Sequence, residues 1–438
     1  MTMKRILAAL LVLCPAAASA QTWTVRQCID YALENNITVK QNSITVEQRE
    51  IDLSTARARR LPGLSAGASQ NFSFGRGLTA DNTYANTNTT STSFSLSTDL
   101  TLFNGGDINY GIKMSRLELA AATEDLAKIK DDIRVSVAQA YVQILYCKEI
   151  LGVSKSQVQR DSMQLERIKA MQLSGMASSA EVASQQSSLA QSRLSAVQAR
   201  SNLKLALLDL SQLLELPSPE GFDVVSPDAG MLETRILPNP EYIYSLALDI
   251  RPEIRSDSLR LEYAELSIAK AKGAYLPSLS LSGGLGSNYY TSSGYVSNPF
   301  SDQIRNNFSQ YIGLSMHVPI FNRFSTKNSV RNSQLNYDAQ VLKSESTKKT
   351  LYKEIQQVYY NAVAAQSKMQ SSSEAAASAE LSMDLTTQKY ENGKANITEY
   401  NEAKNRYLEA ESNFLQARYE CLYQTALVDF YQGKELNF

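Results

Sequence analysis

The sequence of 438 residues repeats itself, and this repetition constrains the fold more than any other feature. The pair Leu61-Pro62 recurs as Leu276-Pro277, 215 positions later, and Gly175 recurs as Gly393, 218 positions later. Two further landmarks keep the same order and nearly the same spacing: Ala32-Leu33 with Ala247-Leu248, and Phe103-Asn104 with Phe321-Asn322. Four landmarks in one order indicate two copies of one structural unit.

Each copy contains a long stretch that favours helix. Residues 113–216 and 323–438 contain no proline and very few glycines, the two residue types that most weaken a helix interior. Apolar residues in the second copy step alternately by four and three positions, which is typical of a coiled-coil seam. They are matched by apolar residues in the first copy: Ile133, Val137, Ala140, Ile144, Cys147 and Leu151. We expect two coiled-coil hairpins, over 108–215 and 325–431, whose longest helices span about 100 Å.

Between the helical stretches the hydrophobic period changes to two. Apolar and polar residues alternate in a way that predicts four half-buried strands, over 64–74, 93–103, 279–289 and 311–321. The connections between them, residues 75–92 and 286–308, are rich in Asn, Ser, Thr and Tyr, as expected of long exposed loops.

The predicted strands are long enough to cross a bilayer when tilted. Four strands do not close a barrel, and open sheet edges are not tolerated in hydrocarbon, so several chains must share one barrel. Two chains would supply eight strands, whose side chains nearly fill the interior, whereas three chains would leave a lumen. The fold class expected is therefore mainly α with a membrane β-barrel, completed in a trimer.

The first 20 residues have the pattern of a secretory signal peptide. Lys4 and Arg5 form a charged start, an apolar stretch follows, and Ala18-Ser19-Ala20 is a small-residue cleavage signal. We therefore expect residues 1–20 to be removed and the mature chain to begin at Gln21.

Prolines that crowd residues 217–239 mark an equatorial linker between the two copies. The linker separates a first repeat, residues 21–216, from a second repeat, residues 240–438. Ahead of the first strand in each repeat, a single helix is expected, over 24–60 and over 240–272.

Composition excludes several classes of function. Lys and Arg number 43 against 44 Asp and Glu, so no surplus of positive charge is available for a nucleic-acid partner. His317 is the only histidine, which excludes a His-dependent triad and a His-rich metal site. Cys28, Cys147 and Cys421 have no C-x-x-C spacing, and no nucleotide-binding motif occurs. We expect no enzymatic activity, no metal and no cofactor.

Three motifs carry a resemblance to a known family: the strand exits LFNGG at 102–106 and IFNRF at 320–324, and the turn KYENGKANITEY at 389–400. With the duplicated Leu-Pro strand entry, the chain resembles TolC-like outer-membrane efflux proteins over essentially all of its mature length. The resemblance implies a homotrimer with a 12-stranded barrel in outer-membrane lipid and an α-helical tunnel in the periplasm. It also implies passive export of small molecules or proteins, with a periplasmic adaptor and an inner-membrane pump of the RND or ABC type as partners.

The resemblance further implies which residues narrow the periplasmic entrance. In that family, acidic residues six and nine positions after the second turn's glycine form rings there, and a tyrosine precedes that glycine by three. The family's arginine two positions after the glycine is replaced here by Ala395. Closure of the entrance by an arginine is therefore in doubt, and Lys394 is the candidate substitute. The aperture residues implied are Glu399, Glu402, Tyr390, Lys394 and Glu181, and the hairpin-tip residues for the adaptor are Leu173, Gly175, Met176, Ala177, Gly393 and Ala395.

The residues alone support plainer alternatives. Glu399 and Glu402 are also explained as charges that solvate a helix face, and Leu173, Met176 and Ala177 as residues that cap the coil. For the whole protein, the alternative is a non-conducting periplasmic coiled-coil protein with a structural or adhesive role. That alternative leaves four bilayer-length strands unexplained, and an exported enzyme lacks a catalytic constellation.

Overall fold

The computed structural model describes residues 21–78, 81–226, 235–293, 296–436 and 438. The expected signal peptide, and residues 227–234 of the linker, lie outside the described residues. The chain divides into two compact units. The hairpin unit comprises the residues up to Asn42, Ala127–Arg251 and Lys349–Phe438, and the sheet unit comprises Ser43–Leu126 and Pro252–Lys348.

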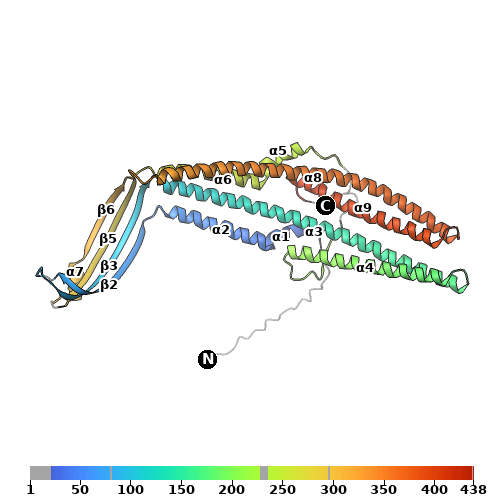
Figure 1. The fold of residues 1–438 in the computed structure, drawn as a ribbon, viewed down its shortest axis with the longest axis horizontal. Coiled ribbons are helices and arrows are strands. Elements are labelled where there is room, and N and C mark those ends of the chain that lie inside the picture. The colour runs from blue at the N-terminus through green and yellow to red at the C-terminus, as the bar shows by residue number, and fades with distance from the viewer. Residues whose placement is uncertain (1–20, 79–80, 227–234, 294–295, 437) are drawn as a thin grey trace, which may run out of the picture. The chain divides into compact units, whose positions relative to one another are not determined.

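The duplication is visible in the lengths of the helices (Figure 1). The long helices α3 and α8 have 67 residues each, and the returning helices α4 and α9 have 35 each. Their bounds are Asp107–Leu173 for α3, Ser325–Glu391 for α8, Ser179–Leu213 for α4 and Ile397–Tyr431 for α9. Each bound in the second copy lies 218 positions after its counterpart, so every residue of α3 and α4 has one defined counterpart in α8 and α9.

The single helices expected over 24–60 and 240–272 are wrong, because each is broken in two. The first copy has α1 (Val25–Asn35) and α2 (Ile37–Ala58), and the second has α5 (Pro240–Ile250) and α6 (Pro252–Gly273). At the first break Asn36 has φ -58° and ψ 130°, which is not helical, and its Oδ1 accepts a hydrogen bond from the Thr38 N–H. At the second break Arg251 is extended because it precedes a proline, which disfavours helical backbone in the residue before it.

The sheet unit contains one antiparallel four-stranded sheet in the order β2-β3-β5-β6 (Figure 1). The strands are β2 (Gly63–Leu78), β3 (Tyr84–Asn104), β5 (Ser278–Ser292) and β6 (Ser309–His317). Each copy supplies one hairpin, and the two hairpins join where β3 pairs with β5. The outer strands β2 and β6 each leave one edge of the sheet open.

The expected loop over 75–92 is wrong, since most of it is strand. β2 and β3 stay paired from Gly63 with Asp99 to Leu78 with Tyr84, so polar side chains on the strands do not stop the backbone pairing. In the second copy β5 runs on to Ser292 and the connection includes the short helix α7 (Phe300–Asn306). The last strand ends at His317 rather than at 321, two residues before a proline that has no N–H to donate.

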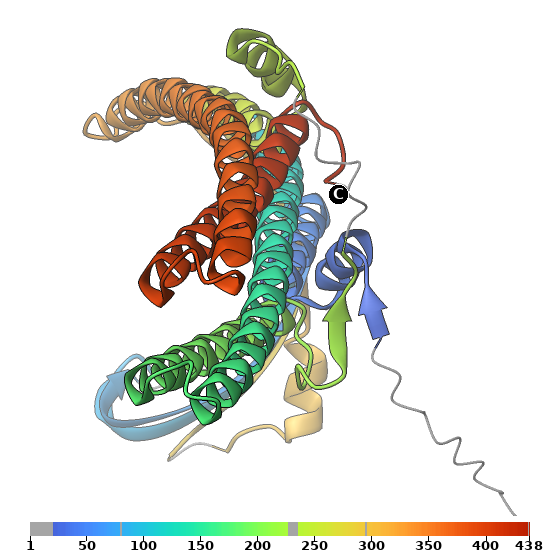
Figure 2. The same cartoon turned by 90° about the vertical axis from the view of Figure 1, so that its right-hand side faces the viewer.

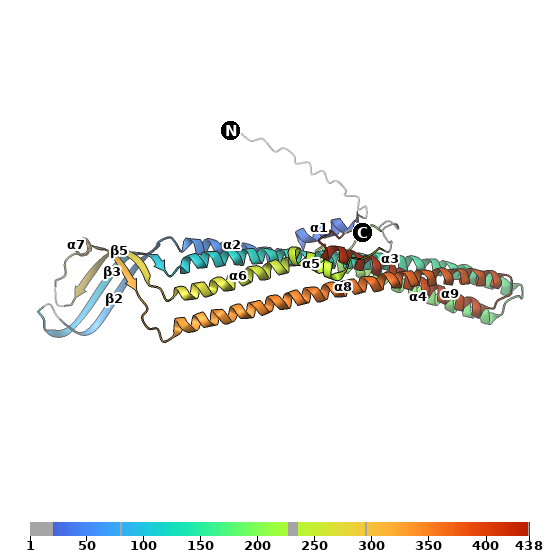
Figure 3. The ribbon, with the colours of Figure 1, turned by 90° about the horizontal axis from the view of Figure 1, so that it is seen from above.

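In the hairpin unit, α3 runs beside α4 and α8 beside α9 (Figures 2 and 3). Beside the hairpins, β1 (Gln21–Trp23) pairs in parallel with β4 (Phe222–Val224). The main core joins residues from α1, α3, α4 and α9 with this small sheet. Tyr141 in this core donates from its hydroxyl to the carbonyl oxygens of Trp23 and Val225, at 3.1 and 2.5 Å.

Most of the predicted seam residues are buried in both copies, among them Val137 and Ile144 in α3 and Leu351 and Ile355 in α8, and the others are half-buried. Cys28, Cys147 and Cys421 are also buried, as free thiols. Among the helices of the described residues, none has a stretch long and apolar enough to cross a membrane.

Candidate functional site

The two hairpin turns have the same geometry. Each long helix ends in a Schellman motif, in which a residue with positive φ follows the last helical turn. Gly175 has φ 78°, and the next residue, Met176, donates from its N–H to the Met171 carbonyl at 2.8 Å. Gly393 has φ 70°, and Lys394 likewise donates to the Lys389 carbonyl at 2.7 Å. Both glycines are therefore required by the turn itself, independently of any partner.

The returning helices begin with side-chain caps. The Ser178 Oγ accepts from the Glu181 N–H at 3.2 Å, while the Glu181 carboxylate accepts from the Ser178 N–H at 2.7 Å. The Asn396 Oδ1 accepts from the Glu399 N–H at 2.9 Å, while the Glu399 carboxylate accepts from the Asn396 Nδ2 at 3.0 Å. Glu181 and Glu399 are counterparts in the two copies, so both carboxylates have a capping role at a helix N-terminus, where negative charge is favourable.

Glu402 and the remaining tip residues have fewer contacts than the capping residues. Glu402 lies one turn beyond Glu399, is exposed, and has an Arg406 Nη2 atom 4.0 Å from its carboxylate. Leu173, Met176 and Lys394 are exposed, and Ala177 and Ala395 are half-buried at the turns. The exposed Leu173 and Met176 thus form an apolar tip on the first hairpin.

Tyr390, near the end of α8, has neighbours in both hairpins. Its ring lies 5.1 Å from the ring of the buried Tyr400, and burial raises its pKa, with the nearby Glu181 carboxylate raising it further. Arg167 in α3 forms an ion pair with Glu391 in α8 at 2.9 Å, one residue from Tyr390. The structure therefore places Tyr390, Glu181 and Glu399 close to one level, at the ends of three different helices.

Sequence reasoning missed a buried charge pair that lies one to two helical turns farther from the hairpin turns than Glu399. Lys404 in α9 contacts Asp161 in α3, with 3.2 Å between Nζ and Oδ1, and both side chains are buried. Ser192 in α4 donates to the other oxygen of Asp161, and the Gln185 side chain donates to the Asp161 carbonyl at 3.2 Å. Lys404 lies within the expected hairpin over 325–431, but nothing in the sequence spacing indicates a partner in the other copy.

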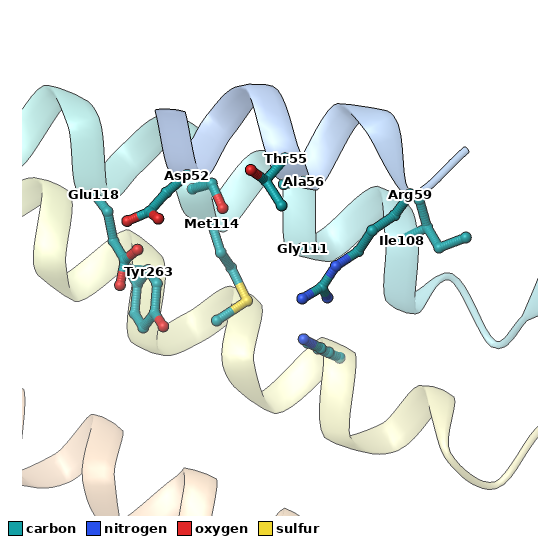
Figure 4. A pocket seen from close by; sticks show the side chains of 11 residues that line it. Asp52, Thr55, Ala56, Arg59, Ile108, Gly111, Met114, Glu118 and Tyr263 are labelled. Atoms are coloured by element: carbon teal, nitrogen blue, oxygen red, sulfur yellow. The ribbon is translucent and has the colours of Figure 1, made fainter. Parts of the chain in front are cut away.

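A separate pocket of about 250 Å³ lies in the sheet unit between α2, α3 and α6 (Figure 4). Met114 projects into it from α3, Asp52 borders it from α2, and Arg59 borders it from the turn that follows α2. Tyr263 of α6 lies beside Glu118, and its pKa is raised by burial and then by that carboxylate. The lining mixes both signs of charge with apolar surface, as the packing of three helices does.

The potential metal ligands are dispersed. His317, the single histidine, is exposed at the end of β6. Over residues 21–436, apart from the gaps named above, His, Cys, Asp and Glu form no group of three that could hold a metal ion.

Comparison with known proteins decides the family. The sequence matches the family described as outer membrane efflux protein over residues 28–215 and again over 243–432, one match for each copy. The chain belongs to this family. Members of this family are located in the outer membrane. The two separate matches, one for each half of the chain, agree with the internal duplication of the fold.

Relatives and solved structures agree with the assignment. Outer membrane protein TolC of Salmonella enteritidis is 24% identical over 433 residues, covering 96% of this chain and 84% of the relative. TolC of Escherichia coli (strain K12) is 23% identical, with the same coverage. The structure of CusC shares the fold with a TM-score of 0.78 at 18% identity, covering 93% of this chain and 91% of that chain. VceC of Vibrio cholerae has a TM-score of 0.76 at 16% identity, covering 94% and 96%.

Proposed function

We propose that three copies of this outer membrane efflux protein form a channel-tunnel that passively exports small molecules or proteins. The observation that carries the proposal is the four-stranded sheet with two open edges, β2 and β6. An open edge in hydrocarbon leaves backbone N–H and C=O groups without partners, so the β2 edge must meet the β6 edge of another copy. Three sheets joined in this way give 12 strands and a lumen.

The surfaces of the edge strands support a lipid environment. Phe72 and Phe74 on β2 are exposed, as are Ile312, Leu314 and Met316 on β6. Large apolar side chains exposed along a sheet edge favour aggregation in water but are suited to a bilayer. Such a sheet is not expected in a non-conducting periplasmic coiled-coil protein.

The hairpin tips are the proposed entrance. Three copies of Glu399 and Glu402 around a threefold axis would form acidic rings that attract cations, with Tyr390, Lys394 and Glu181 beside them. The caps described above hold Glu181 and Glu399 in place, so capping and ring formation are compatible roles for the same carboxylates.

Partners supply the energy and the cargo. The turns at Gly175 and Gly393, with the exposed apolar residues Leu173 and Met176 and with Ala177 and Ala395, are the proposed contact for a periplasmic adaptor. An inner-membrane pump of the RND or ABC type would then load the tunnel. No catalytic step and no cofactor are part of this function.

Native mass spectrometry in detergent, followed by planar-bilayer recording, tests the proposal. We expect trimers that insert and conduct in discrete steps. Well-folded protein that is monomeric, or trimers that insert without ever conducting, would contradict it.

A further inference from the structure

The basic residues of the sheet unit gather at one end of its sheet. The antiparallel register places the start of β2, the end of β3, the start of β5 and the end of β6 together at this end. The ten residues that adjoin each strand here are 53–62, 105–114, 268–277 and 318–327. These four segments contain one acidic residue, Asp107, and eight basic residues, which we call the collar: Arg57, Arg59, Arg60, Lys113, Lys270, Lys272, Arg323 and Lys327.

The rest of the sheet and its connections carry no such excess. The connections at the opposite end, residues 79–83 and 293–308, contain one basic and two acidic residues. The four strands contain one Arg and one Asp, and the whole chain has 43 basic and 44 acidic residues. The collar is therefore a local concentration of positive charge rather than a consequence of composition.

The collar charges have few partners within the chain. Seven of the eight side chains are exposed, while Lys270 is half-buried and forms an ion pair with Asp107 at 3.3 Å. Arg60 donates to the Asn109 side chain at 2.8 Å. Among the described residues, five collar side chains form no ion pair and no hydrogen bond: Arg57, Arg59, Lys113, Lys272 and Arg323. These five charges are available to an anion from outside the chain.

Aromatic side chains mark this end of the sheet as a membrane boundary. Tyr275, Phe321 and Phe324 belong to the same segments and are more than half exposed. Aromatic residues are enriched where hydrocarbon meets the lipid headgroups, and membrane barrels carry a girdle of them at each interface. The Lys327 ammonium lies 5.8 Å from the Phe324 ring centroid, so a collar charge and an aromatic ring share one level. The collar therefore lies at the level of the headgroups once the sheet spans a bilayer.

The apolar face of the sheet leads to the collar. Ala66, Leu96 and Leu285 form one row across β2, β3 and β5, and residues paired in this way share a face. The opposite face carries serines, among them Ser65 and Ser97, whose hydroxyl oxygens lie 2.9 Å apart. In a membrane barrel the apolar face meets lipid tails and the polar face meets the lumen. The lipids that cover the apolar face thus have their headgroups beside the collar.

The collar is densest where two chains of the proposed trimer meet. Joining the β2 edge to the β6 edge of the next chain brings segment 53–62 beside segment 318–327. The two segments together contain five basic residues and no acidic residue. Cations that converge repel one another unless an anion lies between them. Arg57, Arg59 and Arg323, which have no partner in their own chain, therefore need a countercharge at this junction.

We propose that the collar binds the phosphate groups of phospholipids with a net negative charge, in the leaflet next to the helices, with its strongest site at the junction of two chains. The inference rests on the trimeric duct proposed above and assigns a ligand to its membrane boundary. A guanidinium binds phosphate oxygens through two parallel hydrogen bonds, and the long Arg and Lys side chains reach the headgroups while their stems cover apolar surface.

Spin-labelled lipids test the proposal. Trimers are reconstituted in phosphatidylcholine vesicles that contain a trace of spin-labelled phosphatidylglycerol or spin-labelled phosphatidylcholine, and electron spin resonance measures the immobilised fraction of each. We expect phosphatidylglycerol to be preferred by about fivefold, the gain that one basic residue near an anionic surface provides. The preference should disappear in about 1 M salt, which screens exposed charges, and this result needs no variant. Equal immobilisation of the two lipids at low salt would overturn the proposal.

A variant without four of the collar charges locates the site. Arg57→Gln, Arg59→Gln, Lys272→Gln and Arg323→Gln are combined. Because these side chains are exposed and have no partner within the described residues, the variant should fold and form trimers like the parent protein. The preference for phosphatidylglycerol should fall below about twofold. A preference as strong as that of the parent protein would overturn the assignment to the collar.

The matched control removes four charges from one helix away from the collar. Lys343→Gln, Lys348→Gln, Lys349→Gln and Lys353→Gln replace exposed lysines of α8, the first of them about 27 Å along the helix from Ser325. The control should keep the full preference for phosphatidylglycerol. Loss of the preference in the control as well would show an effect of net charge and would also overturn the proposal.

Two further measurements distinguish lipid from other anions. Inorganic phosphate should reduce the preference no more than chloride does at equal ionic strength, and a specific effect of phosphate would assign the collar to a free anion instead. The reversal potential in a salt gradient should be the same for the parent protein and the collar variant. A shift toward cation selectivity in the variant would place these side chains in the lumen and overturn the proposal.

Failure of the duct and failure of the collar give different results. Protein that enters vesicles only as a monomer would contradict the trimeric duct and with it the junction between chains. Conducting trimers that show no preference for phosphatidylglycerol would contradict the collar alone.

Discussion

Asp161 and Lys404 lie 243 positions apart in the sequence, yet they form an ion pair of 3.2 Å within the hairpin unit. The contact joins the first copy to the second, and Ser192 from a third helix satisfies the other carboxylate oxygen. Because both side chains are buried, removing one of them leaves the other charge uncompensated.

Substitution of one partner in this pair should be strongly destabilising. We expect Lys404→Met to lower the free energy of unfolding by about 3–5 kcal/mol, the range for an orphaned buried charge. Adding Asp161→Leu should recover much of the loss, since an apolar pair needs no desolvation of charge. Denaturant unfolding of the trimer, followed by circular dichroism, measures both. A single variant as stable as the parent protein would contradict the assignment.

The turn glycines should resist substitution for a conformational reason alone. An added Cβ at Gly393 meets no atom within 4 Å, so Gly393→Ala should cost about 1–2 kcal/mol through the left-handed backbone conformation. Gly152 lies inside α3 with the same open space, and Gly152→Ala should stabilise by about 0.5–1 kcal/mol. Thermal unfolding of the two variants in parallel should show shifts of opposite sign.

Charge and capping at Glu399 can be separated. Glu399→Gln keeps an acceptor for the Asn396 side chain but removes the charge, whereas Asn396→Ala removes the cap and should cost about 1 kcal/mol. If the acidic rings control the entrance, Glu399→Gln with Glu402→Gln should raise conductance and weaken block by divalent cations in planar bilayers. Asn396→Ala should leave that block in place. Equal effects from both variants would favour capping as the sole role.

Alkaline pH should destabilise the hairpin unit through Tyr419. Burial, followed by the nearby Glu149 carboxylate, raises the pKa of Tyr419 to about 12 from its ordinary value of 10. The folded state therefore holds this proton more tightly than the unfolded state does. The contribution is complete below pH 10 and is lost as the pH rises toward 12. Unfolding measured across this range should show a shallower loss of stability in Tyr419→Phe, and an unchanged slope would refute the assignment.

Local sequence signals predicted much of the fold. The glycines at 175 and 393 mark the turns, and the alternation of threes and fours along α3 and α8 predicts the buried seams. The same signals did not predict where helices break or how far strands extend, because these features depend on backbone conformation and backbone pairing. Asn36 and Arg251 break helices that have no glycine at the break, and β2 and β3 extend through residues whose side chains are polar on both faces.

The family and the candidate entrance also came from local motifs, because the turn that carries Tyr390 and Glu399 is continuous in sequence. The capping contacts of Glu181 and Glu399 needed the structure, although the S-x-x-E spacing at Ser178 signals such a cap.

By itself the sequence determined the duplication, the lengths of the hairpin helices, the turns and the presence of alternating strands, because each depends on residues within a few positions of one another. Only the tertiary structure decided which charges meet across the hairpins and which apolar faces of α4 and α8 remain open. The physical reason is that burial and ion pairing depend on distances in space. Helices with the same hydrophobic period have different neighbours once the two copies pack together.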